Sequence, residues 1–129
     1  MTTGGRVAGR KCIMLVEDTP SHRKLYASWL EIGGYDTHVL EDERDAQRRA
    51  EDVRPDAIIV DIRLPNLSGL DVIEGLKTTE TTRTIPVMAL TVLDSPQDKE
   101  ACLAAGADAF VTKPDHIATF LDRISGLLA

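Results

Sequence analysis

Five short apolar runs, separated by segments with helical patterning, constrain the fold of this chain most strongly. Several runs are apolar throughout, as in strands covered on both faces of a sheet. The runs expected to form strands cover residues 11–16, 35–40, 56–60, 84–90 and 107–112. Alternation of strands and helices favours parallel βαβ units with right-handed crossovers. The sequence therefore predicts an α/β fold, a doubly wound five-stranded parallel sheet with five helices on both faces.

Length and composition limit the domain organisation and the class of function. With 129 residues, 43% of them hydrophobic, the chain has the size of one globular domain. A net charge of −6 argues against general nucleic-acid binding, which depends on clustered Lys and Arg. Without an apolar run near 18 residues or a signal peptide, no membrane association and a cytoplasmic location are expected. Residues 1–10 are expected to be a flexible tail before a domain at 11–129.

Two helix starts carry specific local signals. Thr19 is expected to be an N-cap, with Pro20 at the first helical position, where its missing N–H is not needed. Ser95, Pro96 and Asp98 form a similar arrangement of hydroxyl, proline and third-position acid. A polar helix is also expected over 41–53.

Polar side chains follow four of the predicted strands, at the point where each strand ends. Glu17 and Asp18 follow the first strand, Asp61 the third, Thr91 the fourth and Lys113 the fifth. The carboxyl ends of parallel strands lie at one edge of a sheet, and this edge usually carries the function in such folds. We therefore expect the five side chains to converge.

Three carboxylates in one small volume require a compensating charge. Like charges at close range cannot all stay ionised, and Mg²⁺ prefers oxygen ligands of this kind. The sequence thus predicts a Mg²⁺ site, with Mn²⁺ as a second option. Asp61 is the best candidate for a reactive carboxylate, because it closes a central strand. Phosphoryl transfer to it would require surrounding cations and donors, for which Lys113 and Thr91 are suited.

The combined motif resembles the receiver domain of two-component response regulators. The resemblance spans about residues 11–128, and within the family the single-domain DivK and CheY types are most similar, because nothing follows the last helix. It is carried by Glu17-Asp18, Asp61-Ile62-Arg63-Leu64-Pro65 with Gly69, Thr91, and Phe110-Val111-Thr112-Lys113-Pro114. It implies a flavodoxin-like sheet with strand order 2-1-3-4-5.

The resemblance also implies a role for each site residue. Asp61 would accept a phosphoryl group from a histidine kinase or a histidine phosphotransfer protein. Asp18 and Asp61 would bind Mg²⁺ directly, together with the backbone carbonyl of Arg63, while Glu17 would act through a water molecule. Lys113 would contact the acyl phosphate. No other catalytic activity is implied beyond the protein's own phosphotransfer and autodephosphorylation.

Signalling is implied to occur through altered protein–protein binding. Thr91 would move toward the phosphoryl group while Phe110 turns inward as the switch, and the Lys113–Pro114 bond resembles one that is cis in the family. The first helix around Ser21, His22 and Leu25, with the loop 114–116, would meet the phosphodonor. The fourth helix, last strand and last helix would meet a downstream protein. The protein would be a monomer or a weak phosphorylation-dependent dimer.

Two residues depart from the family pattern. Val92 follows Thr91, where the family usually has a small residue, and Arg63 lies two positions after Asp61. Both are expected to change the autodephosphorylation rate, in a direction that the sequence leaves open. Phe110 has no hydroxyl group, so a switch at this position must act through packing.

Other functions fit the residues less well. A phosphohydrolase of the haloacid dehalogenase type would have a second acid where this chain has Arg63. A flavodoxin-like cofactor binder would not have Glu17 and Asp18 in its first loop, because they repel phosphate. Dinucleotide and P-loop binders require glycine motifs that are missing here. The main alternative is an interaction module that keeps the fold and acts without phosphorylation.

Overall fold

A parallel five-stranded sheet forms the centre of the protein. The computed structural model describes residues 9–92, 95–113 and 116–129. The strands are β1 (Cys12–Val16), β2 (Asp36–Leu40), β3 (Ala57–Asp61), β4 (Val87–Thr91) and β5 (Ala109–Thr112). Their order in the sheet is β2-β1-β3-β4-β5, and all neighbouring pairs are parallel. The predicted fold class and strand order are confirmed.

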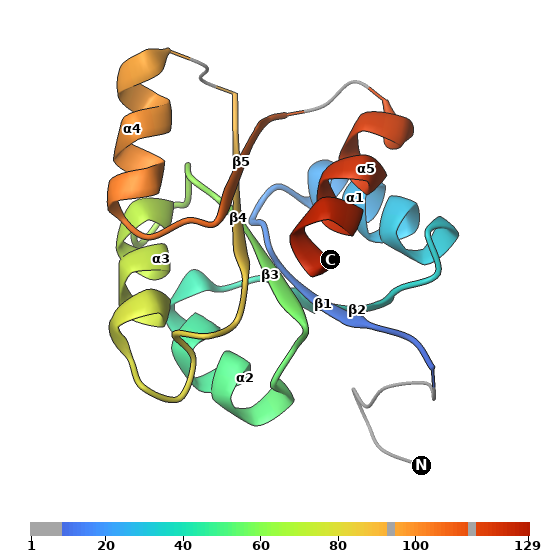
Figure 1. Ribbon diagram of the computed structural model, residues 1–129, viewed down its shortest axis with the longest axis horizontal. Helices are drawn as coiled ribbons and strands as arrows, with labels where there is room; N and C mark the ends of the chain where they lie inside the picture. Colours follow the sequence, from blue (N-terminus) through green and yellow to red (C-terminus); the bar gives the residue numbers. More distant parts are fainter. Residues whose placement is uncertain (1–8, 93–94, 114–115) are drawn as a thin grey trace.

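Helices cover both faces of this sheet, giving three layers (Figure 1). They are α1 (Pro20–Ile32), α2 (Ala46–Val53), α3 (Gly69–Thr78), α4 (Pro96–Ala104) and α5 (Ile117–Leu128), with a short 3₁₀ helix, η1 (Glu43–Asp45), before α2. α1 and α5 lie on one face, and α2, α3 and α4 lie on the other. Within the described residues, no helix has both the length and the apolar character needed to span a bilayer.

Two hydrophobic clusters fill the space between the layers. Successive residues of β1 alternate between them, so that Ile13 and Leu15 pack toward α1 and α5 while Met14 and Val16 pack toward α2 and α3. Every residue of β1, β3 and β4 is buried. This double coverage explains why the corresponding runs are apolar throughout.

The expected helix over 41–53 is divided in the structure. Asp42 has an extended backbone, and its side chain accepts a hydrogen bond from the backbone N–H of Arg44 at 2.9 Å, which starts η1. Only from Ala46 onward does an α-helix follow. The prediction of one continuous helix was therefore wrong, because an N-cap within the segment and the buried side chain of Glu43 interrupt it.

Local signals at the other boundaries were partly correct. Ser95 caps α4 by accepting from the N–H of Asp98 at 3.2 Å, as predicted. Thr19 is the N-cap residue of α1, but its side chain makes no capping hydrogen bond. The fourth strand begins at Val87 rather than near Thr84, because Ile85 belongs to a turn in which its N–H donates to the carbonyl of Thr82.

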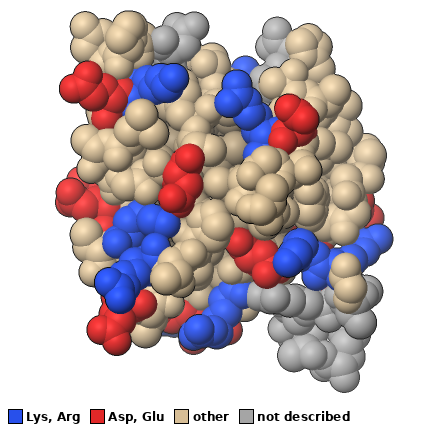
Figure 2. All heavy atoms as spheres, viewed as in Figure 1, with Lys and Arg blue, Asp and Glu red and all other residues tan. Residues whose placement is uncertain are grey.

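Charges are mixed on the face seen in Figure 2, where acidic and basic side chains lie among each other. The expectation from composition that the chain is not a general nucleic-acid binder stays a prediction. The predicted tail at 1–10 falls mostly outside the described residues, and the division into a tail and a domain at 11–129 stays a prediction.

Candidate functional site

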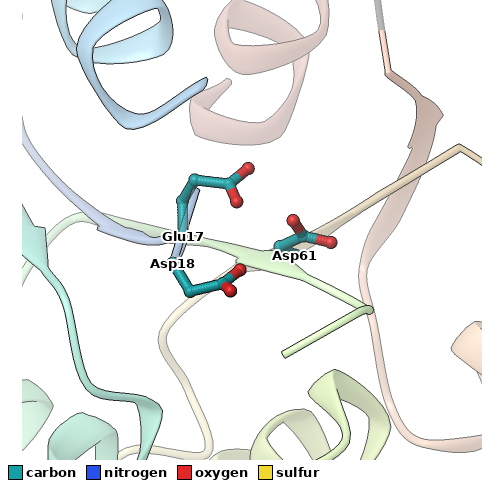
Figure 3. A group of neighbouring side chains, drawn as sticks. All are labelled: Glu17, Asp18 and Asp61. Carbon is teal, nitrogen blue, oxygen red and sulfur yellow. The ribbon is translucent and has the colours of Figure 1, made fainter. Parts of the chain in front are cut away.

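Three carboxylates meet at the carboxyl ends of β1 and β3. Glu17 and Asp18 follow β1 directly, and Asp61 is the last residue of β3 (Figure 3). One oxygen of each can be chosen so that all three lie within 4.8 Å of one another. Glu17 and Asp61 are buried, whereas Asp18 is partly exposed. The structure thus brings these three predicted residues together in an arrangement suited to a divalent cation.

Lys113, which follows β5, links the buried acids. Its Nζ lies 2.9 Å from Glu17 Oε1 and 2.9 Å from Asp61 Oδ2. A third contact of 2.9 Å joins Nζ to Nδ1 of His22 on α1. Because an ammonium group only donates, the imidazole accepts at Nδ1. All three N–H bonds of Lys113 therefore have a partner.

One ammonium does not neutralise the acidic cluster. The pKa of Glu17 is raised to about 7, chiefly by burial and then by the hydrogen bond with Asp61, which outweigh the opposing effect of Lys113. Burial lowers the pKa of Lys113, but its hydrogen bonds to Asp61 and Glu17 raise it more, so the net shift is upward. Lys113 therefore stays charged at neutral pH. The donor set, carboxylate oxygens with surplus negative charge, fits a hard divalent cation.

Backbone contacts hold the acids in place. The N–H of Thr19 donates to Glu17 Oε2 at 3.2 Å. On the other side of the site, the N–H of Arg63 donates to Asp61 Oδ1 at 2.9 Å. Each contact lies two residues after the acid that it binds, so the turn following each strand orients its carboxylate.

Arg23 binds the backbone of the segment that carries Glu17 and Asp18. Its guanidinium group donates to the carbonyl of Glu17 at 3.3 Å and to that of Asp18 at 3.0 Å. A third contact of 3.2 Å pairs it with Glu41. Sequence reasoning missed Arg23 as a site residue, and it assigned His22 to a partner surface. Both residues lie in the first turn of α1, which begins two residues after the acidic pair, and this closeness in sequence was the available signal.

Gly69 lets α3 begin against the backbone of Asp61. A Cβ at this position would lie 2.2 Å from the Asp61 carbonyl oxygen and 2.5 Å from the Cα of Ile62. The N–H of Gly69 also donates to the carbonyl of Ile62 at 2.9 Å. Only glycine fits such a close approach of two backbone segments, which explains its place in the motif after Asp61.

The remaining predicted residues lie at or near the carboxyl ends of β3, β4 and β5. Thr91, the last residue of β4, is buried, and its carbonyl accepts from the N–H of Lys113 at 2.5 Å. Phe110 on β5 is partly buried against the cluster beneath α2 and α3. Val92 and Arg63 are both exposed. Pro114 and the 114–115 part of the expected partner loop fall outside the described residues.

Comparisons with known proteins agree with this geometry. A family profile for the response regulator receiver domain matches residues 13–125. The polar-differentiation response regulator DivK of Brucella anthropi is 36% identical over 118 residues, which cover 92% of this chain and 96% of that protein. The DivK protein of Brucella ovis shows the same identity and coverage.

Two solved structures show the same architecture. The chemotaxis protein CheY4 of Vibrio cholerae superposes with a TM-score of 0.87 at 27% identity, covering 93% of this chain and 100% of that one. The receiver domain of the sensor histidine kinase PA1611 from Pseudomonas aeruginosa has a TM-score of 0.85 at 32% identity, with 93% and 98% covered. That structure is described with a magnesium ion coordinated in its active site cleft.

Proposed function

The chain belongs to the family of response regulator receiver domains, and from this membership and the geometry of its acidic site we propose that Asp61 accepts a phosphoryl group in a Mg²⁺-dependent reaction. The donor would be a histidine kinase or a histidine phosphotransfer protein. The observation that carries the proposal is the position of the Asp61 carboxylate, which shares a cation-sized site with Glu17 and Asp18 and lies 2.9 Å from Lys113.

Asp61 acts as the nucleophile. One carboxylate oxygen forms the new P–O bond as the P–N bond to the donor imidazole breaks, and the electron pair of that bond stays on the imidazole nitrogen, which takes up a proton from solvent. An ionised carboxylate needs no general base. Lys113 compensates charge on the phosphoryl oxygens as they approach, in the manner of the positioned cations of other phosphoryl-transfer sites.

Asp18, Asp61, the carbonyl of Arg63 and, through water, Glu17 would hold the Mg²⁺. When bound, the ion would neutralise charge on both the carboxylates and the phosphoryl oxygens. The three convergent acids support this set of ligands. The magnesium named for the related PA1611 receiver domain also supports it.

The phosphorylated form would signal by binding a downstream protein, as receiver domains are signalling modules rather than enzymes acting on other substrates. Thr91 would respond to the phosphoryl group, and Phe110 would follow by a change in packing. A groove of about 590 Å³ lined by residues of α4, β5 and α5, including Leu103 and Phe110, supports this face as the one that meets the target. The phosphodonor would approach α1 near His22, in the cytoplasm, where kinases have access to ATP.

Incubation with acetyl phosphate and Mg²⁺ tests the proposed function. We expect the protein to gain the mass of one phosphoryl group, and we expect EDTA to prevent the gain. An acyl phosphate is labile in base and is cleaved by hydroxylamine, whereas phosphoserine resists hydroxylamine. If no phosphate is incorporated from acetyl phosphate or from a panel of phosphorylated histidine kinases, the chain acts as a phosphorylation-independent interaction module instead.

Mg²⁺ is expected to stabilise the fold. At about one hundred times its dissociation constant, an ion that binds only the folded state raises the free energy of unfolding by about 2.7 kcal/mol. Thermal unfolding in Mg²⁺ and in EDTA measures this effect. Asp18→Asn should lose most of the gain, whereas Asp52→Asn, a matched change at an exposed position on α2, should keep it. Identical midpoints with and without Mg²⁺ would contradict the assignment.

Arg63 and Val92 are expected to influence how long the phosphate survives. Both side chains are exposed next to residues of the site, with Val92 52% exposed. Either side chain could alter the access of water to an acyl phosphate on Asp61. We expect Arg63→Ala and Val92→Ala each to change the autodephosphorylation rate, measured as loss of radiolabelled phosphate in Mg²⁺. Autodephosphorylation rates equal to that of the wild type would show that these two side chains do not control the lifetime of the phosphate.

A further inference from the structure

Glu43 is a buried acid with no part in the proposed phosphoryl transfer. Among the described residues, three acidic side chains are buried, and the other two are Glu17 and Asp61. Glu43 lies in η1, between β2 and α2, and is 2% exposed. A carboxylate is rarely buried in this way unless it is fully hydrogen-bonded, so its partners indicate what it does.

The side chain of Glu43 accepts three hydrogen bonds from the loop between β3 and α3. Its Oε2 accepts from the backbone N–H of Asn66 at 2.5 Å and from that of Leu67 at 2.9 Å. Its Oε1 accepts from the side-chain amide of Asn66 at 3.2 Å. Burial alone would raise the pKa of Glu43, but the hydrogen bonds from Leu67 and Asn66 outweigh it, and the net shift is downward. Glu43 is therefore a charged group that holds this loop.

The same loop carries the residues nearest to Asp61. At its start, the N–H of Arg63 donates to Asp61 Oδ1, and at its end the N–H of Gly69 donates to the carbonyl of Ile62. Glu43 holds the middle of the loop from a different part of the fold, 23 and 24 residues earlier in the chain. These contacts fix the loop at both ends and at its centre.

We propose that Glu43 is a positioning residue for the cation site, which it serves by holding the 62–68 loop in the conformation in which the carbonyl of Arg63 would bind Mg²⁺. The inference rests on the proposed function, because that function assigns this carbonyl to Mg²⁺. Groups that orient metal ligands without touching the metal commonly change affinity 10–100-fold when they are replaced. A loop carbonyl depends on such support more than a ligand on a strand does, because the loop has more conformations available.

Measurement of Mg²⁺ affinity by isothermal titration calorimetry tests the inference. Glu43→Ala removes all three acceptor contacts, and we expect its dissociation constant to rise by about tenfold or more. Glu43→Gln keeps one oxygen for the two backbone N–H groups, and the Asn66 amide can rotate to accept from the new NH₂, so we expect affinity within about threefold of the wild type. Hydrogen exchange at Asn66 and Leu67 should be faster in the Ala variant than in the wild type or the Gln variant.

Thr82→Val separates a positioning role from a general loss of stability. Thr82 is buried, and its hydroxyl donates to the carbonyl of Leu76 at 2.7 Å and accepts from the side-chain amide of Gln47 at 3.1 Å. Neither partner lies in the 62–68 loop, so the change destabilises the fold without removing a contact of that loop. We expect this variant to bind Mg²⁺ like the wild type. If Glu43→Ala fails to fold, Glu43→Asp repeats the test, since a side chain one methylene shorter draws the carboxylate away from Asn66 and Leu67.

The possible outcomes distinguish the two claims. Wild-type protein that binds no Mg²⁺ overturns both the proposed function and this inference. Wild-type protein that binds Mg²⁺, with Glu43→Ala or Glu43→Asp binding equally well, overturns the positioning role alone. A weaker affinity that is also found in Thr82→Val overturns it as well. Weak binding in Glu43→Ala or Glu43→Asp, with rescue by Gln, supports it.

Discussion

Asp61→Asn is expected to take up phosphate from acetyl phosphate in Mg²⁺ at a rate at least about a hundredfold below that of the wild type. The amide keeps the shape of the side chain but supplies neither an ionised oxygen as nucleophile nor the charge that helps to hold a cation. The intact protein mass, measured over a time course, reports the result. Labelling of Asp61→Asn with base-labile phosphate would show that another residue is the acceptor.

Two comparisons test whether the loss of phosphate uptake results from the missing carboxylate of Asp61. Asp52→Asn, the same change at an exposed position on α2, should be phosphorylated like the wild type. In EDTA, Asp61→Asn should unfold at least as high in temperature as the wild type, because hydrogen bonding with Asp61 and its negative charge both raise the pKa of Glu17. A variant that fails to fold would mean that its loss of labelling reflects lost structure and not the missing acceptor.

Gly69→Ala is expected to lower the free energy of unfolding by about 3 kcal/mol. The new Cβ would meet the carbonyl oxygen of Asp61 at 2.2 Å and the Cα of Ile62 at 2.5 Å. Both neighbours are backbone atoms, so relief requires that α3 or the end of β3 shift as a whole. Urea unfolding followed by circular dichroism measures the loss.

Gly126→Ala is the matched control for this change. Gly126 lies within α5, and apart from the helix's own backbone no heavy atom of the described residues comes within 4 Å of an added Cβ. Alanine in a helix is favoured over glycine, so we expect this variant to gain about 0.5–1 kcal/mol. Equal stability of the two variants would mean that the close approach at Gly69 is relaxed easily.

The fold could be read from the sequence because β1, β3 and β4 are buried along their whole length. Strands that are buried on both faces have continuous apolar sequences, and polar residues at their ends identify the edge of the sheet where a site forms. Glu17, Asp18 and Asp61 were found in this way without any knowledge of contacts. Their chemical roles stay predictions until phosphate and Mg²⁺ binding are measured.

Glu43 could not be found by the same reasoning. It lies in a segment rich in charged residues, where the pattern favours an exposed helix face, and its burial depends on Asn66 and Leu67, which are distant in sequence. His22 was placed on a surface for a similar reason, because its contact with Lys113 joins residues 91 positions apart. Periodicity reports which face of an element is apolar, but not which polar group will meet it from another element.

The bonding of Lys113 has a consequence for anions that reach the site. An ammonium has three hydrogens, and here Glu17, Asp61 and His22 accept one each. An arriving oxyanion must displace one of these acceptors, so it exchanges one contact for another instead of adding a new one. His22 is the most exposed of the three, with 42% of its side chain accessible, and is the easiest to displace. Free phosphate should therefore bind weakly on its own. An anion that does bind would displace the imidazole of His22 from Lys113, so occupation of the site would move a side chain on α1.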